Sequence, residues 1–218
     1  MHISEGFLPW KHAAAWTVAS APMFLYGLRR VSRTMAEGQE ARLRIAAAAG
    51  FLFALSALKL PSVSGSCSHA VGVALGAILL GPAVMPALCF VVLVFQALVL
   101  AHGGVTTLGA NLFSLGVVGP WVAWWVAGGR TPSRGRAFLA GFAGSIAVYA
   151  TTSVELALAF PDLGGGVAAA FLRFAGLFAI TQVPIAMVEG IVTFLVLQTV
   201  SDYMGSARGL APVRGMAG

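Results

Sequence analysis

Residues 70–101 read AVGVALGAILLGPAVMPALCFVVLVFQALVLA, and this run without a single charged residue decides the class of the protein. A helix that crosses a bilayer needs about 20 mostly apolar residues, so the run is too long for one crossing. It contains Gly81-Pro82 and Pro86, and proline ends a helix because it removes a backbone donor and clashes with the preceding turn. We therefore predict two membrane helices, 69–81 and 87–101, which meet near Pro82.

Similar apolar stretches occur along the whole chain. Of the 218 residues 59% are hydrophobic and 9% are charged, whereas a soluble domain carries about 25% charged residues. A water-soluble fold of this size could not bury so much apolar surface, so we predict an all-α, polytopic membrane protein. We expect one domain over 1–218, with an external segment 1–11, a helical bundle 12–201 and a cytoplasmic tail 202–218. The seven predicted membrane helices are 12–28, 45–60, 69–81, 87–101, 110–127, 137–160 and 174–200.

The distribution of basic residues predicts the orientation of this bundle. Arginine and lysine concentrate in cytoplasmic loops, and here they concentrate in 29–44, in 128–136 and after Asp202. The N-terminus is then outside and the C-terminus inside. This topology also accounts for the net charge of +6 without nucleic acid. Ten basic residues lie on the predicted inner side: Arg29, Arg30, Arg33, Arg42, Arg44, Arg130, Arg134, Arg136, Arg208 and Arg214. Lys11, Lys59 and Arg173 lie near the outer side.

The chain begins MHISEGFLP, which is neither basic nor continuously apolar, so we expect no cleaved signal peptide. A retained start matters because the amine of Met1, the amide nitrogen of His2 and the Nδ1 atom of its imidazole can chelate one metal ion. A deprotonated peptide nitrogen suits square-planar or tetragonal nickel, copper or cobalt. One further imidazole, such as that of His69, would complete a four-nitrogen plane.

The segment 59–72, KLPSVSGSCSHAVG, is predicted to be an outer loop, as is 101–111, AHGGVTTLGAN. Between them they contain His69 and His102. Serine and glycine around His69 offer hydroxyl donors that can hold an imidazole from behind, although a histidine at this position can also simply cap a helix. Cys67 is an alternative soft ligand. His12 lies beside Lys11 and is interpreted as a solvated interfacial residue.

Four stretches together resemble one family over essentially the whole chain: MHISEGFLP, SGSCSHAVG, Gln96 with AHGGVTTLGAN, and PIAMVEG (184–190). They resemble the CbiM/NikM family, the substrate-binding membrane components of energy-coupling-factor transporters for cobalt and nickel. The resemblance implies that Met1, His2 and His69 are the metal ligands. It also implies seven membrane helices with the N-terminus outside, which is the topology that the arginines predict.

The same resemblance implies a partnership and a location. We expect a transmembrane coupling subunit, ATPase subunits and a separate small two-helix membrane subunit, in a bacterial cytoplasmic membrane, with a place in cobalamin biosynthesis. The pattern GxxxxGK[ST] is absent, so this chain is expected to be a non-catalytic transport subunit. It would hold no permanent cofactor. Its substrate would be Co²⁺, with Ni²⁺ as the alternative, since identical ligands do not separate the two ions.

Other polar residues are predicted to support the site. Glu189 lies in the last predicted membrane helix, where an ionisable group is a functional candidate, although a neutral carboxyl bonded to the helix gap near Pro184 is an alternative. The predicted supporting residues are Ser66, Ser68, Gln96, His102, Asn111 and Glu189.

Three other interpretations use parts of the same sequence. A haem-bearing electron-transfer protein would use His69 and His102 as axial ligands, which leaves the Met1-His2 start unexplained. A vitamin-binding component of the same transporter class would have no use for a chelate at residue 2. An intramembrane serine or cysteine enzyme would need a nucleophile held against a base, and the sequence indicates none.

Overall fold

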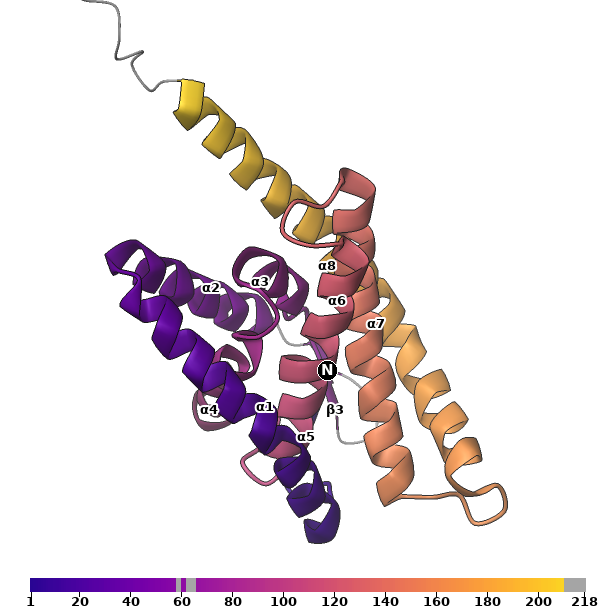
Figure 1. The fold of residues 1–218 in the computed structure, drawn as a ribbon. Coiled ribbons are helices and arrows are strands. Elements are labelled where there is room, and N and C mark those ends of the chain that lie inside the picture. The colour runs from indigo at the N-terminus through magenta and orange to yellow at the C-terminus, as the bar shows by residue number, and fades with distance from the viewer. Residues whose placement is uncertain (58–59, 62–65, 210–218) are drawn as a thin grey trace, which may run out of the picture.

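A computed structural model describes residues 1–57, 60–61 and 66–209. The chain folds into a bundle of helices with one small sheet inserted into it (Figure 1). Helices α1 and α2 form a hairpin, and α7 packs along α8. The helical segments are α1 (Trp10–Ala36), α2 (Gln39–Ala57), α3 (Val73–Leu80), α4 (Met85–Val99), α5 (Leu108–Leu112), the π-helical η1 (Phe113–Val118), α6 (Gly119–Ala127), α7 (Arg134–Ala159) and α8 (Gly166–Gly209). The strands are β1 (His2–Ile3), β2 (Leu60–Pro61) and β3 (Ser66–Ser68).

Each predicted membrane helix corresponds to a helical segment, and α5, η1 and α6 follow one another as one segment over the predicted 110–127. Within the described residues, three segments are long and apolar enough to cross a bilayer: Leu108–Ala127, Arg134–Ala159 and Gly166–Tyr203. Helix α4 is a shorter apolar helix. The all-α membrane class is therefore confirmed in outline, and a total of seven crossings stays a prediction.

The predicted helix 69–81 is wrong in its first residues. Helix α3 begins only at Val73 and has eight residues, which at about 1.5 Å per residue is far short of a bilayer core of about 30 Å. The residues before it do not join the helix because 66–68 form β3 and Gly72 adopts a left-handed backbone (φ 72°). A Cβ atom at Gly72 would lie 3.0 Å from Leu55 Cδ2 and 3.1 Å from Phe51 Cε1, so glycine also permits close packing on α2.

The break between α3 and α4 lies where the sequence predicts it. Gly81 ends α3 with a positive φ of 95°, and its amide donates to the carbonyl of Ala77 at 2.8 Å. Pro82 cannot continue the helical hydrogen bonds, and α4 starts at Met85 with Pro86 in its first turn. The two short helices thus turn back on each other inside the bundle.

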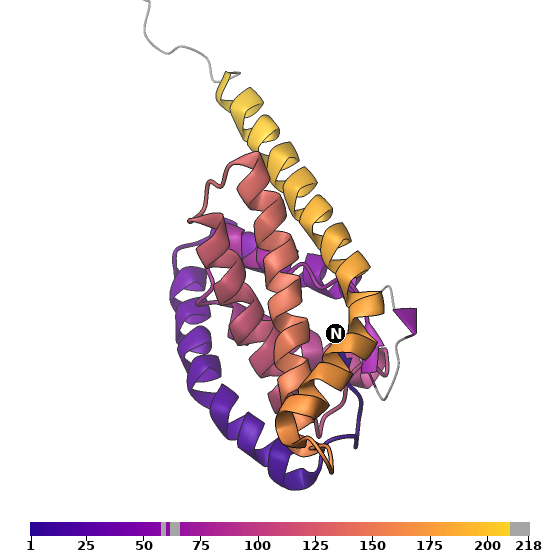
Figure 2. The ribbon, with the colours of Figure 1, turned by 90° about the vertical axis from the view of Figure 1, so that its right-hand side faces the viewer.

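The chain start belongs to the core. Met1 and Ile3 are buried in one apolar cluster with Leu156 of α7 and Phe178 of α8. The segment 1–11, predicted to be external, therefore begins inside the bundle, and the N-terminus lies among the helices in both views (Figures 1 and 2). The chain start also belongs to a three-stranded antiparallel sheet in the order β1-β3-β2, which was not predicted from the sequence.

The two ends of the bundle differ in the segments that they carry. The α1–α2 turn, the α6–α7 connection and the C-terminal part of α8 lie at one end, whereas the start of α1 and the α7–α8 connection lie at the other (Figures 1 and 2). The arginine-rich segments 29–44 and 128–136 consequently share one end, as predicted. Lys59 lies outside the described residues. Which end faces the cytoplasm stays a prediction.

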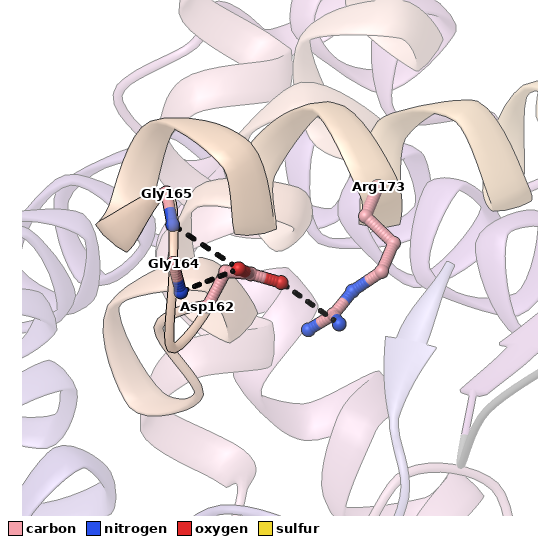
Figure 3. Close-up of polar contacts among 4 residues, drawn as sticks. All are labelled: Asp162, Gly164, Gly165 and Arg173. Atoms are coloured by element: carbon pink, nitrogen blue, oxygen red, sulfur yellow. Dashed lines mark hydrogen bonds and ion pairs between the residues drawn. The ribbon is translucent and has the colours of Figure 1, made fainter.

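Asp162 shapes the connection at the arginine-poor end. Its carboxylate accepts the amides of Gly164 at 3.0 Å and Gly165 at 3.2 Å, and it pairs with Arg173 at 3.2 Å (Figure 3). The backbone donors, and then Arg173, lower the pKa of this carboxyl. The tight turn between α7 and α8 lets the two helices pack antiparallel along their length.

Candidate metal centre

Strand pairing brings the chain start to the His69 loop. Strand β1 pairs antiparallel with β3, with His2 opposite Cys67 and Ile3 opposite Ser66. Strand β2 covers the other edge of β3. His2 therefore lies opposite Cys67, which comes two residues before His69 in the chain. The side chains of Ser66 and Cys67 lie outside the described residues, so their predicted roles stay predictions.

Asn111 and Thr107 clamp the next residue, Ile3. The amide of Ile3 donates to Asn111 Oδ1 at 2.8 Å, and its carbonyl accepts from Asn111 Nδ2 at 3.0 Å and Thr107 Oγ1 at 2.9 Å. Neighbouring residues of a strand direct their backbone polar groups to opposite sides. Since those of Ile3 point to α5, the amide of His2 faces β3 and the chain that leads to His69.

The segment after Ile3 is held by the loop before α5. The amide of Glu5 donates to the carbonyl of Gly103 at 2.9 Å, and the amide of Gly6 donates to Thr106 Oγ1 at 3.0 Å. The amide of Thr106 in turn donates to the Glu5 carboxylate at 3.3 Å. Interactions with Thr106, first with its side chain and then with its amide, lower the pKa of that carboxyl. Glu5 and Gly6 therefore have a structural role. Neither Thr106 nor Thr107 was identified from sequence.

Three histidines meet in the interior. His2, His69 and His102 are 0%, 1% and 2% exposed, and the Nδ1 atom of His2 contacts the Nε2 atom of His69. The ring centroids of His2 and His69 are 4.4 Å apart, and the His102 ring stacks on that of His69 at 5.4 Å. His12, by contrast, is partly exposed on α1 and belongs to no such cluster.

The tautomer of His69 follows from its surroundings. Its Nδ1 atom lies 3.1 Å from the carbonyl oxygen of Ala70. A carbonyl can only accept, so Nδ1 carries the proton and Nε2 presents its lone pair. That lone pair is directed at His2, and the supporting carbonyl fixes the ring orientation in the way that metal-binding histidines require.

Gln96 lies on the other side of the His2 ring. Its Nε2 donates to Ser56 Oγ, and Ser56 donates onward to the carbonyl of Phe53 at 2.8 Å. The Nε2 atom of Gln96 is therefore paired with Ser56, and the amide oxygen is the other polar atom of this side chain. This oxygen and His2 Nε2 are both buried without a hydrogen-bond partner among the described residues, and both residues line one cavity of about 10 Å³.

Burial sets the charge state of His2. Desolvation lowers the pKa of its imidazole well below the usual range, and the charges of His69 and of the terminal amine lower it further. The ring is therefore neutral at neutral pH. A neutral imidazole is the form that binds transition metals, because the coordinating nitrogen must carry a free lone pair.

Glu189 of α8 supports the residues after His69. Its carboxylate accepts the amide of Val71 at 2.6 Å and that of Gly72 at 3.3 Å, and it interacts electrostatically with the terminal amine. The alternative prediction of a bond to the helix gap near Pro184 is wrong, because these donors belong to the chain that leads into α3. The carboxylate thus links the amine end of the chain to the His69 segment.

Ser68 has a different role from the predicted one. Its hydroxyl accepts from Gln182 Nε2 and lies 3.3 Å from Thr181 Oγ1, both on α8. We expected a donor to the histidines, but successive side chains of a strand point to opposite faces, and that of Ser68 points at α8. Glu155 of α7 was not identified from sequence. It is fully buried, and its carboxylate has no hydrogen-bond partner among the described residues.

Side chains alone do not complete a metal centre here. No group of three or more His, Cys, Asp or Glu side chains in the described part of the chain is arranged to hold a metal ion. The two imidazole nitrogens that face each other therefore need further donors. The terminal amine and the backbone amide of His2 are the nitrogen donors nearest along the chain.

Comparisons with known proteins agree on one family. Residues 2–206 match the family described as CbiM, cobalt uptake substrate-specific transmembrane region. The "Cobalt transport protein CbiM 2" of Pelobacter propionicus is 48% identical over 219 residues, which cover 99% of this chain and 97% of that protein. A "Cobalt transport protein CbiM" of Roseiflexus is 52% identical over 199 residues, covering 90% of this chain and 80% of the relative.

Solved structures share the fold. One described as the crystal structure of a transition metal transporter superposes with a TM-score of 0.79 at 24% identity, and covers 99% of this chain and 100% of its own. A truncated transition metal transporter gives the same TM-score over 93% of this chain.

We expect Asn111→Ala to loosen the chain start, because it removes the two hydrogen bonds that the Asn111 side chain makes with the amide and the carbonyl of Ile3. Leaving a buried backbone group unpaired costs about 1–3 kcal/mol, so the free energy of unfolding should fall by that order. Thr107→Val is the matched control, because it removes only one of the two side-chain donors to the Ile3 carbonyl and should cost less. Thermal unfolding in detergent measures both, and equal losses would contradict the assigned role of Asn111.

Proposed function

Because the chain belongs to the CbiM family of cobalt-uptake membrane proteins, we propose that it is the substrate-specific component of a transition-metal importer and captures Co²⁺ at the His2–His69 contact. The single observation that carries this proposal is the meeting of His2 Nδ1 and His69 Nε2 in a buried pocket at the chain start. A component of this kind binds the ion and catalyses no reaction.

The proposed ligands are four nitrogens. The amine of Met1 and the amide nitrogen of His2 close a five-membered ring on the ion, and the amide and Nδ1 of His2 close a six-membered ring. His69 Nε2 supplies the fourth donor. A planar nitrogen set with a deprotonated amide suits Co²⁺ or Ni²⁺ and is unsuited to Mg²⁺ or Ca²⁺, which take oxygen ligands.

The surrounding residues support such a chelate in distinct ways. The carbonyl of Ala70 holds the proton of His69 on Nδ1, so that Nε2 presents its lone pair toward His2. Gln96 offers an amide oxygen beside His2 Nε2, which would favour the tautomer whose Nδ1 is free. Glu189 interacts electrostatically with the terminal amine and accepts the amides of Val71 and Gly72, so it would hold the amine end of the chelate close to the His69 segment.

The capture would occur on the outer face, in a bacterial cytoplasmic membrane. Energy would come from ATPase subunits through a transmembrane coupling subunit, with a small two-helix membrane subunit alongside. The family membership and the arginine-rich end of the bundle support this arrangement. Cobalt is favoured over nickel by the names of the relatives, which are cobalt transport proteins.

The geometry does not favour the haem interpretation. The rings of His69 and His102 stack 5.4 Å apart with 10° between their planes, an arrangement that leaves no slot for a macrocycle between them. The cavity beside the histidines is about 10 Å³, whereas organic ligands occupy pockets of about 300–1,000 Å³. The same small cavity disfavours a vitamin as the substrate of this site.

An unextended N-terminus should be essential for metal binding. One glycine added before Met1 moves the amine by about 3.8 Å and takes it out of the five-membered ring. We expect equilibrium binding of Co²⁺ to weaken by at least about 100-fold, because loss of a residue that only orients a metal ligand already costs about 10- to 100-fold. A variant whose added residues a protease removes is the control and should regain affinity. Unchanged binding by the extended chain would refute the chelate.

The imidazole of His69 should be required, and that of His12 should not. We expect His69→Ala to lose at least about 100-fold in affinity for Co²⁺, since it removes a nitrogen donor and loss of a residue that only orients a ligand already costs about 10- to 100-fold. His12→Ala carries the same change on the exposed part of α1 and should bind normally. Isothermal titration on folded, detergent-solubilised protein measures both. Full affinity in His69→Ala would instead assign the fourth donor to Cys67 or His102.

Gln96 tests the tautomer argument separately. Gln96→Leu removes the acceptor beside His2 Nε2, and we expect affinity for Co²⁺ to fall by about tenfold, as for other residues that orient a metal ligand. Gln96→Glu keeps an acceptor and should restore most of the loss. Gln182→Leu is the control, because that residue bonds to Ser68 and not to a histidine. If the glutamate variant binds as weakly as the leucine variant, the acceptor role is wrong.

A further inference from the structure

The arginine-rich end of the bundle contains a groove that the metal centre does not explain. It has a volume of about 750 Å³ and is formed by α1, α2, the α3–α4 connection and α6. Its lining includes Arg30, Arg44, Arg130, Leu79 and Trp121. No ligand of the proposed metal site takes part, so the groove requires an explanation of its own.

The charges of the groove come from separate parts of the chain. Arg30 lies on α1, Arg44 on α2 and Arg130 in the α6–α7 connection, and Glu37 is the single carboxylate in the lining. None of the three arginines forms a salt bridge or hydrogen bond among the described residues. Three guanidinium groups facing one space repel one another, and an anion with several oxygens would remove that repulsion through paired hydrogen bonds.

Apart from Thr34 and Glu37, the remaining lining is apolar, and it lies at the border of a membrane span. Leu79 is 38% exposed and Trp121 is 42% exposed. The apolar segment Leu108–Ala127 ends directly before Arg130, so the groove lies at the depth where hydrocarbon gives way to headgroups. Tryptophan is enriched at that depth. Such a border position does not suit a nucleic acid, and a freely soluble anion would make no use of the apolar side chains.

We propose that this groove binds an anionic phospholipid, with the phosphate between Arg30, Arg44 and Arg130 and the glycerol and upper acyl chain along Leu79 and Trp121. Basic pockets between membrane helices recognise anionic headgroups by this combination of charge and apolar contact. The lipid would tie the α1–α2 hairpin to α6. The site is independent of the metal proposal, because none of the proposed metal ligands lines the groove.

The test compares two triple variants of the full chain in detergent. Arg30→Gln, Arg44→Gln and Arg130→Gln remove the groove charges, and Arg29→Gln, Arg33→Gln and Arg134→Gln remove equal charge outside the groove. Native mass spectrometry measures retained phosphatidylglycerol, and thermal unfolding is followed with added phosphatidylglycerol, phosphatidylcholine or inorganic phosphate. We expect the groove variant to lose at least tenfold in phosphatidylglycerol retention, since each basic residue near an anionic lipid surface contributes about fivefold.

The outcomes separate the proposal from its rivals. Phosphatidylglycerol should raise the unfolding temperature of the wild type and the control variant, whereas phosphatidylcholine should not. Equal loss of lipid from both triple variants would overturn the proposal in favour of general surface charge, and equal stabilisation by inorganic phosphate would overturn it in favour of a soluble anion. Unchanged lipid retention in the groove variant, with loss of a co-purifying subunit, would assign the groove to a protein partner. Retained Co²⁺ binding shows that the variants are folded.

Discussion

The pairing of β1 with β3 is the constraint on which the site depends. Met1, His2 and Ile3 are buried, and buried backbone groups need hydrogen-bond partners. The pairing with β3 and the hydrogen bonds between Ile3 and Asn111 hold this backbone, so the first three residues have a defined position despite being a chain terminus. A terminus is ordinarily the least ordered part of a chain. Here it is held as firmly as a core strand, and that order is what a chelate built from a terminal amine needs.

A sheet inside a helical membrane protein is tolerated for the same reason. Irregular or extended backbone is excluded from the lipid phase but is accepted where protein surrounds it. The helices α7 and α8 enclose this sheet on one side, through Leu156 and Phe178, and the loop before α5 encloses it on the other. Helix α3 is short as a consequence, because the residues before Val73 form β3 and the turn at Gly72.

The metal centre and the arginine-rich end of the bundle are organised by different physics. The His69 Nδ1 atom donates to the carbonyl of Ala70, and Gln96, near His2, donates to Ser56, in surroundings where an unpaired polar atom is costly. The arginine-rich end has long, exposed cationic side chains around a wide groove. The first arrangement suits recognition of one small ion by geometry. The second suits an anionic surface, for which charge and depth matter more than fixed distances.

The sequence by itself determined the membrane class, the helix break at Gly81-Pro82 and the location of the arginine-rich segments at one end of the bundle. It also indicated that His2 and His69 lie close together. These follow from composition, proline geometry and the resemblance of local motifs. It did not reveal the sheet, the short α3, the binding of Ser68 to α8, or the chain from Gln96 through Ser56 to Phe53. Several of these features join residues that are distant in the sequence, for example Gln96 with Ser56, which are 40 positions apart, and Ser68 with Gln182, which are 114 apart. Only the tertiary structure decided them, because local periodicity carries no information about which distant backbone or side-chain group will satisfy a buried polar atom.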